Sequence, residues 1–394
     1  MKRNYLIAII CSLVMILLFG SVFFTLPEGE KRIKVGYIYV GDASTAYTYN
    51  FILAEEKIAE TYGDRVENIK KYNVTEGEEK ESLEELISEG CEIIFGTSYG
   101  YGETLKNAAK EHPEIQFCQA TCSNAGEKPV LSNYHTFMGK IFEGRYVSGV
   151  AAGMKLKEMI AKGEIKKDEA LIGYVGAFSC AEVISGYTAF FLGVRSVVPE
   201  AEMKVRYTNT WSDFVEEKAV AIQLINEGCR IISQHSDTYG PAVACENAKQ
   251  KTFHISYNQN MLDMAPTTSI IGCRINWEPY MVSAVGAVLN DEKIEKVLDA
   301  DIHGTDAGAG FLQNWVQMLE LNEHIAAKGT KKAIEQCIDR LSAEDQLLFI
   351  GDYQGVDPAD PSDTIDLNEG YEENKDSSAP TFHYILKDVI HVEK

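Results

Sequence analysis

Positive charge is scarce in this sequence. Its 394 residues include 37 lysine and arginine residues against 59 aspartate and glutamate residues, which gives a formal net charge of −22. Binding to nucleic acid depends on lysine and arginine side chains that neutralise phosphate groups. The charge balance therefore argues against a nucleic-acid partner, and the acidic excess is typical of a surface selected for solubility.

The signatures of several common catalytic sites are also missing. No Gly-x-Gly-x-x-Gly turn follows a predicted strand, and there is no P-loop, no Gly-x-Ser-x-Gly turn and no His-Glu-x-x-His pair. Nine cysteines are present, but Cys118 and Cys122 lack the spacing of a redox pair or of a zinc site. We therefore predict no catalytic residue, no metal and no cofactor.

The amino terminus carries a long apolar run. A basic start precedes uncharged residues from Tyr5 to Leu26. About 20 apolar residues can span a bilayer, whereas the core of a signal peptide usually has ~7–15. Residues 1–30 are therefore predicted to be a membrane anchor, with a cleaved signal peptide or a lipid attached at Cys11 as alternatives. All three place the remaining chain outside the cytoplasmic membrane.

One segment of the sequence occurs twice. Residues 86–102 and 224–240 both begin Leu-Ile-x-Glu-Gly-Cys-x-Ile-Ile and both end Tyr-Gly. Each copy is typical of a helix end, a glycine stop, a short buried strand and a polar loop. Ligands of open parallel sheets gather at loops beyond the carboxyl ends of strands. The repeat therefore predicts two similar α/β lobes, with the loops at 98–101 and 235–238 facing each other across a cleft.

Strands and helices alternate through both halves. An apolar strand is predicted at Ile33–Val40 and its counterpart at Ala170–Val175, each with Gly-Tyr inside it. Alternation of this kind is typical of a parallel sheet with right-handed crossovers. After Asp301 the pattern loosens, with a surface excursion predicted at Val356–Ser378 and a closing strand at Tyr384–Val392. We expect this tail to pack on the second lobe.

Six segments in a particular order carry a resemblance to a known family. They are Tyr37–Tyr49, Thr97–Tyr101, Gly173–Phe178, Thr210–Asp213, Ile232–Asp237 and Arg274–Tyr280. Through them the chain, from Ile33 to about Gly355, resembles the basic membrane protein (BMP) family of substrate-binding proteins, which includes purine nucleoside receptors of ABC importers. The segments with Trp-Ser-Asp, Gln-His-Ser-Asp and Asn-Trp look most like a branch that binds purine bases such as adenine.

The resemblance implies a fold. Proteins of this family have the type I periplasmic-binding-protein fold, an α/β fold in which two Rossmann-like lobes joined by three crossovers close on a ligand. By resemblance the crossovers fall near residues 136–139, 274–277 and 304–308. The implied division of the chain is residues 1–30 as anchor or signal, 33–137 with 276–305 as the first lobe, and 138–275 with 306–394 as the second lobe.

The resemblance also implies aromatic ligand contacts. Tyr47 stands where the family places a ring against the purine, although the base-binding branch usually has Gly-Trp-Thr where this chain has Ala-Tyr-Thr. Phe178 is the candidate for the opposite face of the base, with core packing as the alternative. Trp211 either covers the cleft or staples the helix that follows it. Trp277 is expected to anchor the hinge helix more than to touch the ligand.

Polar candidates come from the same loops. Asp42 and Asp237 are carboxylates that could accept hydrogen bonds from a purine amino group or a ribose hydroxyl, although Asp237 could instead cap a helix. His235 could bond to a ring nitrogen. Asn260 stands where the family often has Asp, and Arg274 falls near a lysine that contacts the sugar in nucleoside-binding members. The complete set of predicted ligand-binding residues is Asp42, Tyr47, Thr48, Ser98, Tyr99, Phe178, Trp211, His235, Asp237, Asn260, Arg274 and Trp277.

These features together predict a solute-binding protein on the outer face of the cytoplasmic membrane. It would capture a purine base or nucleoside between its lobes and deliver it to the permease and ATPase of an ABC importer. Two alternatives stay open. A sensor ectodomain would bind the same ligands, and a nucleoside hydrolase would use Asp42 or Asp237 with His235.

Overall fold

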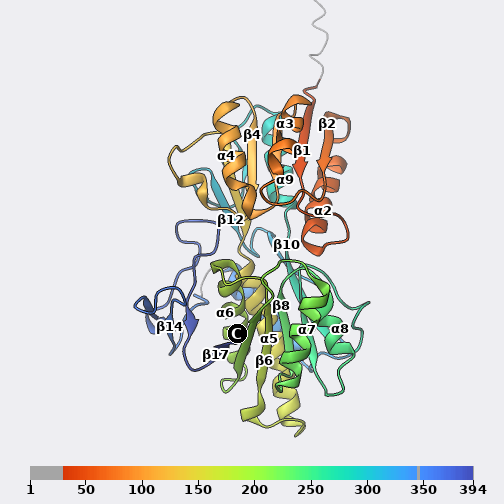
Figure 1. Ribbon diagram of the computed structural model, residues 1–394, viewed down its shortest axis with the longest axis vertical. Coiled ribbons are helices and arrows are strands. Elements are labelled where there is room, and N and C mark those ends of the chain that lie inside the picture. The colour runs from red at the N-terminus through yellow and green to blue at the C-terminus, as the bar shows by residue number, and fades with distance from the viewer. Residues whose placement is uncertain (1–29, 344–346, 394) are drawn as a thin grey trace, which may run out of the picture. The chain divides into compact units, whose positions relative to one another are not determined.

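Two large, mainly parallel sheets, each with one antiparallel pair, organise the chain in the computed structural model, which describes residues 30–343 and 347–393 (Figure 1). The predicted anchor, residues 1–30, lies outside the described residues except for residue 30. Residues 30–32 have no regular secondary structure. Among the described helices, none is both long enough and apolar enough to cross a bilayer.

The first sheet has the strand order β11-β12-β5-β4-β3-β1-β2 and is parallel except for the β11–β12 pair. Its helices lie on both faces, and α2 packs on α9 through a stack of Phe51 on Trp277 with ring centroids 4.3 Å apart. The elements of this first lobe are β1 (Ile33–Ile38), α2 (Ala46–Tyr62), β2 (Val66–Lys71), α3 (Glu79–Ser88), β3 (Ile93–Gly96), α4 (Gly102–Glu111), β4 (Gln116–Ala120), β5 (Tyr134–Gly139), α9 (Glu278–Leu289), α10 (Ile294–Val297), β11 (Asp301–His303) and β12 (Asp306–Ala309).

The second sheet has the order β13-β10-β9-β8-β6-β7-β17. Its first two helices, α5 and α6, approach so closely that a Cβ at Gly149 would lie 2.0 Å from the carbonyl oxygen of Phe190. The elements of this second lobe are α5 (Ile141–Ala161), β6 (Leu171–Gly176), α6 (Ala181–Arg195), β7 (Glu202–Tyr207), α7 (Phe214–Asn226), β8 (Ile231–His235), α8 (Gly240–Glu246), β9 (Phe253–Tyr257), β10 (Ser269–Ile275), β13 (Val316–Met318), α11 (Thr330–Ser342) and β17 (Ile390–Val392).

The sequence repeat corresponds to one helix–strand unit in each lobe. Helix α3 leads to β3 through Gly90 at φ +84°, and α7 leads to β8 through Gly228 at φ +99°. Glycine suits both turns because the left-handed region strains any side chain with a Cβ. The strands that follow, β3 and β8, occupy equivalent places beside β1 and β6. The predicted duplication of an α/β unit is therefore confirmed.

The chain passes between the two sheets three times, after β5, after β10 and after β12. This confirms the predicted type I fold and puts the crossings close to the positions that the resemblance implies. The boundaries differ by a few residues, because Met138 and Gly139 continue β5, and residues 306–309, expected in the second lobe, pair in parallel with β5 of the first sheet.

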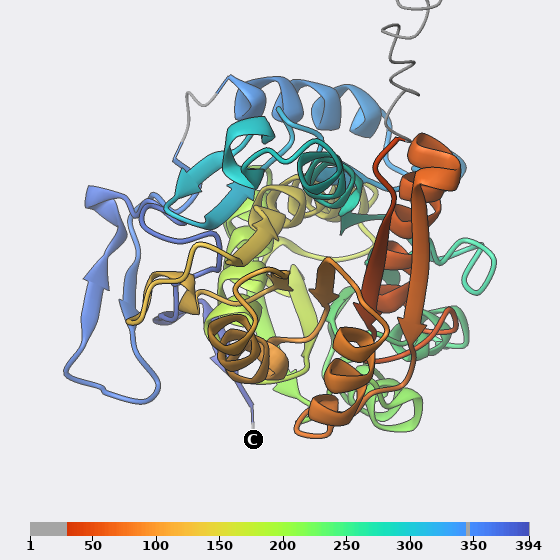
Figure 2. The ribbon, with the colours of Figure 1, turned by 90° about the horizontal axis from the view of Figure 1, so that it is seen from above.

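The C-terminal tail adds a small antiparallel sheet of β14 (Gln354–Val356), β15 (Thr364–Asp366) and β16 (Ile385–Leu386). The predicted closing strand is split, because a turn at Asp388, with φ +63°, separates β16 from β17. Strand β17 pairs with β7, so this part of the tail packs on the second lobe as expected. Figure 2 shows the tail, in blue, beside the elements of the two large sheets.

Candidate ligand-binding cleft

The carboxyl ends of strands from both sheets surround a cavity of about 60 Å³. Strands β1, β3 and β4 of the first sheet each end within two residues of a lining residue, and so do β8 and β9 of the second. This is the edge where the repeat predicts a ligand. The residues that line the cavity are Val40, Tyr47, Ser98, Tyr99, Thr121, Glu182, Trp211, Asp237, Tyr257 and Asn258.

The two lobes are in contact beside this cavity. The side-chain amide of Asn50, on α2, donates to the carbonyl oxygen of Asn258, which follows β9, at 2.9 Å. Arg274, on β10, donates in turn to the Asn50 side-chain oxygen at 3.1 Å. Because these bonds join the lobes at the cavity, the arrangement is a closed one.

Tyr47 presents its ring from the first turn of α2. Its hydroxyl donates to the carbonyl oxygen of Thr97, and its ring meets Phe51 edge-on with centroids 5.2 Å apart. Burial raises the pKa of Tyr47 well above its usual value, so the phenol is neutral at physiological pH. The ring is thus held in place by contacts with its own lobe, and Tyr47 lines the cavity.

Trp211 lines the cavity from the second lobe. Its carbonyl oxygen accepts a hydrogen bond from the backbone N–H of Asp237 at 2.9 Å, which joins two lining residues. Phe178 meets the Trp211 ring at 65° with centroids 5.3 Å apart. Phe178 lies outside the lining, where it supports Trp211, and its direct contact with a ligand stays a prediction.

Asp237 carries a carboxyl group in the lining of the cavity, and its pKa is shifted. Burial raises the pKa of Asp237 to about 8, with further repulsion from the carboxylates of Glu217 and Glu182. The Asn258 side-chain amide, which donates to Asp237 at 3.4 Å, opposes this shift. At neutral pH in the empty cavity the Asp237 carboxyl group is therefore mostly protonated, and a ligand that donates a hydrogen bond would favour its charged form.

Glu182, in the first turn of α6, brings a second carboxyl group to the cavity. Its oxygen lies 3.3 Å from Nε2 of His235. Burial lowers the pKa of His235, so the imidazole is neutral and donates from Nε2 to this carboxylate. His235 also lies against the ring of Tyr257, with centroids 4.3 Å apart. His235 is thus placed beneath the lining, where it orients Glu182.

The remaining predicted residues have other contacts in this structure. Asp42 bonds to Ser44 within its own loop and to Asn73 in the loop after β2. Asn260 accepts from the backbone N–H of Leu262. Those that lie outside the lining are Asp42, Thr48, Phe178, His235, Asn260, Arg274 and Trp277.

Two of them belong to the region where the lobes join. Arg274 donates to Gln317 at 2.8 Å as well as to Asn50. Trp277 is fully buried and stacks between α2 and α9, the packing role expected for it. Thr48 is also fully buried, and its hydroxyl has no hydrogen-bond partner among the described residues.

Sequence reasoning missed Glu182, Thr121, Tyr257, Asn258 and Val40. The repeat offered a signal for the first of these. Tyr47 lies in the first turn of the helix after β1, and Glu182 lies in the first turn of the helix after β6, the equivalent strand. Thr121 and Asn258 are likewise the first residues after β4 and β9.

A group of potential metal ligands in the described chain lies in the tail, not in the cleft. Oxygen atoms of Asp357 and Asp363 and a ring nitrogen of His383 all lie within 4.8 Å of one another. All three side chains are partly exposed, and Asp363 also accepts from the Tyr384 hydroxyl at 3.1 Å. Partial exposure and the bond from Tyr384 explain why these side chains lie together, so we assign no metal site to them.

The chain has two α/β lobes with mainly parallel sheets, three crossings between them and a cavity between facing loops. This arrangement is that of a solute-binding protein of the type I periplasmic class. An ABC transporter solute-binding protein from Aeropyrum pernix K1 has this fold, with a TM-score of 0.65 and 14% identity over 84% of this chain and 95% of its own. The chain belongs to the Bmp family, whose model, described as ABC transporter substrate-binding protein PnrA-like, matches residues 34–340. The predicted family is confirmed.

Two relatives of this chain have names that state different ligands. The chain is 33% identical over 265 residues to a purine-binding protein of Brucella abortus, a match that covers 67% of this chain and 71% of that protein. It is 28% identical over 306 residues, 76% of this chain and 72% of the other, to a candidate glucose-binding protein of an ABC transporter from Haloferax volcanii. Proteins of this family bind a solute outside the cytoplasm, pass it to permease and ATPase subunits, and are not enzymes.

Proposed function

We propose that this protein captures a purine base or nucleoside in the cavity between its lobes and hands it unchanged to an ABC importer. The observation that carries the proposal is the composition of the cavity. Aromatic rings from both lobes, Tyr47 and Trp211, line it together with the carboxyl groups of Asp237 and Glu182. The proposal includes the purine-binding role of the predicted site residues and the attachment to the membrane through residues 1–30.

The aromatic rings suit the faces of a flat heterocycle. Stacking of one base on an aromatic side chain stabilises binding by ~1–3 kcal/mol. Two rings therefore supply a large share of the ~8 kcal/mol that micromolar affinity requires. Tyr47 is fixed by its bond to Thr97, so little side-chain freedom is lost when a ligand binds.

The polar atoms of the cavity suit the edges of such a ligand. The hydroxyl of Ser98 donates to Glu76 at 2.6 Å, and the hydroxyl of Thr121 donates to the carbonyl oxygen of Ala120 at 2.7 Å. Both hydroxyl oxygens are left as acceptors, as is the carboxyl group of Glu182, and Asp237 becomes a charged acceptor once its proton leaves. An acceptor-rich lining matches the amino and ring N–H groups of a purine.

The charge of the lining favours an unphosphorylated ligand. None of the described residues that line the cavity is lysine or arginine. A phosphate group would enter beside two carboxyl groups without a cation to pair with it, which is unfavourable in a buried site. We therefore expect purine bases or nucleosides, and not nucleotides, to bind.

A thermal-shift screen of the purified protein tests this proposal. Adenine, adenosine, AMP, glucose and amino acids are compared at equal concentration. Ligand at 100 times its Kd stabilises the folded state by ~2.7 kcal/mol, so a purine is expected to raise the melting temperature by several degrees. AMP and amino acids are expected to leave it unchanged.

The same samples separate the alternatives. Stabilisation by glucose alone would contradict the purine assignment and would favour the chemistry named for the Haloferax volcanii relative. Chromatography of the adenosine sample is expected to recover adenosine intact. Release of free ribose would instead support a hydrolase.

A further inference from the structure

The C-terminal tail is bonded to the first lobe through a buried carboxylate. The backbone N–H of Ser378 donates to one oxygen of Asp306 at 2.6 Å, and its hydroxyl donates to the other at 2.5 Å. Asp306 begins β12 and also accepts from Thr136 of β5 at 2.8 Å. Asp306 and Ser378 are both buried, so these bonds are shielded from water. They attach the tail to the strands beside two of the three crossings.

A second buried carboxylate attaches the same tail to the second lobe. Glu373 accepts from the hydroxyl of Ser185, on α6, at 2.9 Å. Its other oxygen accepts from the backbone N–H and the hydroxyl of Thr381, which closes the tail around it. Helix α6 is the element whose first turn carries Glu182 into the ligand cavity, and Ser185 follows Glu182 by three residues.

The segment between the two anchors has little slack. Glu373 and Ser378 are five residues apart, a separation that a fully extended chain would span with ~17 Å. The chain is shorter than that, because the side-chain amide of Asn374 donates to the carbonyl oxygens of Ser377 and Ser378 at 2.8 and 2.7 Å. Beyond this turn, Ala379 packs against the apolar core of the first lobe and Phe382 lies in that of the second.

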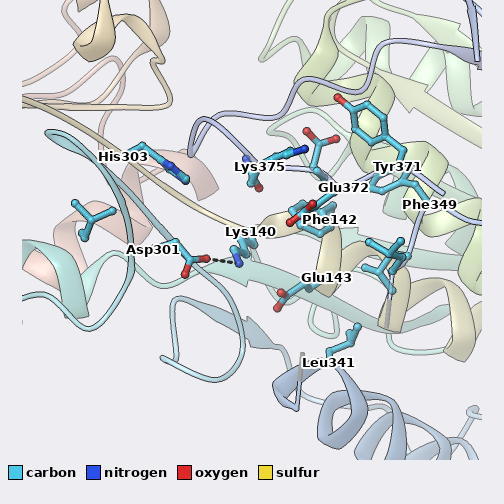
Figure 3. A pocket seen from close by; sticks show the side chains of 15 residues that line it. Lys140, Phe142, Glu143, Asp301, His303, Leu341, Phe349, Tyr371, Glu372 and Lys375 are labelled. Atoms are coloured by element: carbon cyan, nitrogen blue, oxygen red, sulfur yellow. Dashed lines mark ion pairs between the residues drawn. The ribbon is translucent and has the colours of Figure 1, made fainter. Parts of the chain in front are cut away.

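A cavity of about 480 Å³ lies between residues 371–375 of the tail and the first crossing (Figure 3). Tyr371, Glu372 and Lys375 line it from the tail, and Lys140, which directly follows β5, lines it from the crossing. Lys140 is paired with Asp301 of β11 at 2.5 Å. Because open space lies here, residues 371–375 do not pack on the first crossing, and the buried bonds at Asp306 and Ser185, together with the packing of Ala379 and Phe382, attach this part of the tail to the two lobes.

We propose that residues 371–382 form a strap that holds the two lobes in the closed arrangement and slows the release of ligand. The bonds at Asp306 and Ser185 can coexist only while the lobes keep the separation seen here, so they favour the closed state over an open one. The strap lies beyond residues 34–340, which the family model matches. It is therefore a feature of the tail of this chain.

Hydrogen–deuterium exchange of the ligand-free full-length protein tests the strap without any assumption about the ligand. Asp306→Ala releases the first anchor and Ser185→Ala releases the second. Each substitution is expected to speed the exchange of amides in the cleft loops after β1, β3, β8 and β9 by ~10-fold, because each one opens the same cleft. A strap needs both ends, so the double variant is expected to exchange no faster than either single variant.

Asp366→Ala serves as the matched control, since the Asp366 carboxylate bonds to Asn368 within the tail. Its cleft loops are expected to exchange at the wild-type rate. Faster exchange in the tail of the anchor variants with unchanged cleft loops would overturn the strap, and so would additive effects confined to the lobe that carries each substitution. Ser185→Ala removes one hydroxyl group, so it keeps the test decisive if Asp306→Ala does not fold.

Where adenine binds the wild type, its dissociation is expected to be ~10-fold faster in both anchor variants.

Discussion

Asp237→Asn is expected to weaken adenine binding by ~10–100-fold at pH 8. A hydrogen bond to a charged group contributes ~1.5–3 kcal/mol, and the amide replaces a charged acceptor with a neutral one that also carries a donor. The Asp237 carboxyl group lines the cavity and stands beside Glu182, so no nearby cation compensates for its loss. Titration calorimetry of both proteins at pH 6 and pH 8 measures the change.

The pH dependence of binding follows from the raised pKa of Asp237, which lies near 8. Below this value a proton must leave before the carboxylate can accept a hydrogen bond from the ligand. The affinity of the wild type for adenine is thus expected to rise by up to ~10-fold per pH unit from pH 6 to pH 8 and then to level off. The affinity of the Asn variant is expected to be flat across this range.

The same substitution is expected to stabilise the empty protein. Folding raises the pKa of Asp237 from ~4 in the unfolded chain, so the folded state holds this proton more tightly. The resulting contribution to stability is complete below pH ~4 and is lost as the pH rises to about 8. Asparagine never carries the buried charge, so its melting temperature is expected to exceed that of the wild type by several degrees at pH 8 and to match it near pH 4.

Asp42→Asn is the matched control for this experiment, because Asp42 was the other carboxylate predicted to bind the ligand. The structure places it in bonds to Ser44 within its own loop and to Asn73 in the loop after β2. Its substitution is expected to leave adenine affinity within ~2-fold of the wild type. A loss equal to that of Asp237→Asn would show that the loop of Asp42 reaches the ligand in solution.

Tyr47→Ala is expected to weaken adenine binding by ~10–100-fold, the loss of one stacking face. Tyr47→Phe keeps the ring and removes only the hydroxyl bond to the carbonyl oxygen of Thr97, so its affinity is expected to stay within ~3-fold of the wild type. Trp211→Ala is expected to resemble Tyr47→Ala, since Trp211 faces the cavity from the other lobe. Wild-type affinity in Tyr47→Ala would contradict the stacking role of this ring.

The fold could be predicted from the sequence because the pattern of one α/β unit occurs in both halves of the chain. Residues 86–102 and 224–240 share their helix end, their glycine and their strand, and local rules suffice to interpret each part. The tail carries no such pattern. Its buried anchors, Asp306–Ser378 and Ser185–Glu373, join residues 72 and 188 positions apart. Contacts of this kind depend on the assembled lobes and leave no periodic signal.

The candidate site could be predicted only in part, for a related reason. The resemblance led to Tyr47, Trp211 and Asp237, which the structure gathers around one cavity. It also led to Asn260, whose side chain is engaged by the backbone of Leu262. Glu182 went unnoticed because a glutamate in the first turn of a helix is common, and its equivalence to Tyr47 gains meaning only with its contact to His235 and its place in the cavity.

The most direct test of the central claim is a crystal structure of the protein grown with adenine. We expect one molecule of the base in the cavity between the lobes, with its faces against Tyr47 and Trp211 and an N–H group within hydrogen-bond distance of the Asp237 carboxylate. Density for the base at any other position, or an empty cavity at saturating adenine, would contradict the claim that this cleft holds a purine.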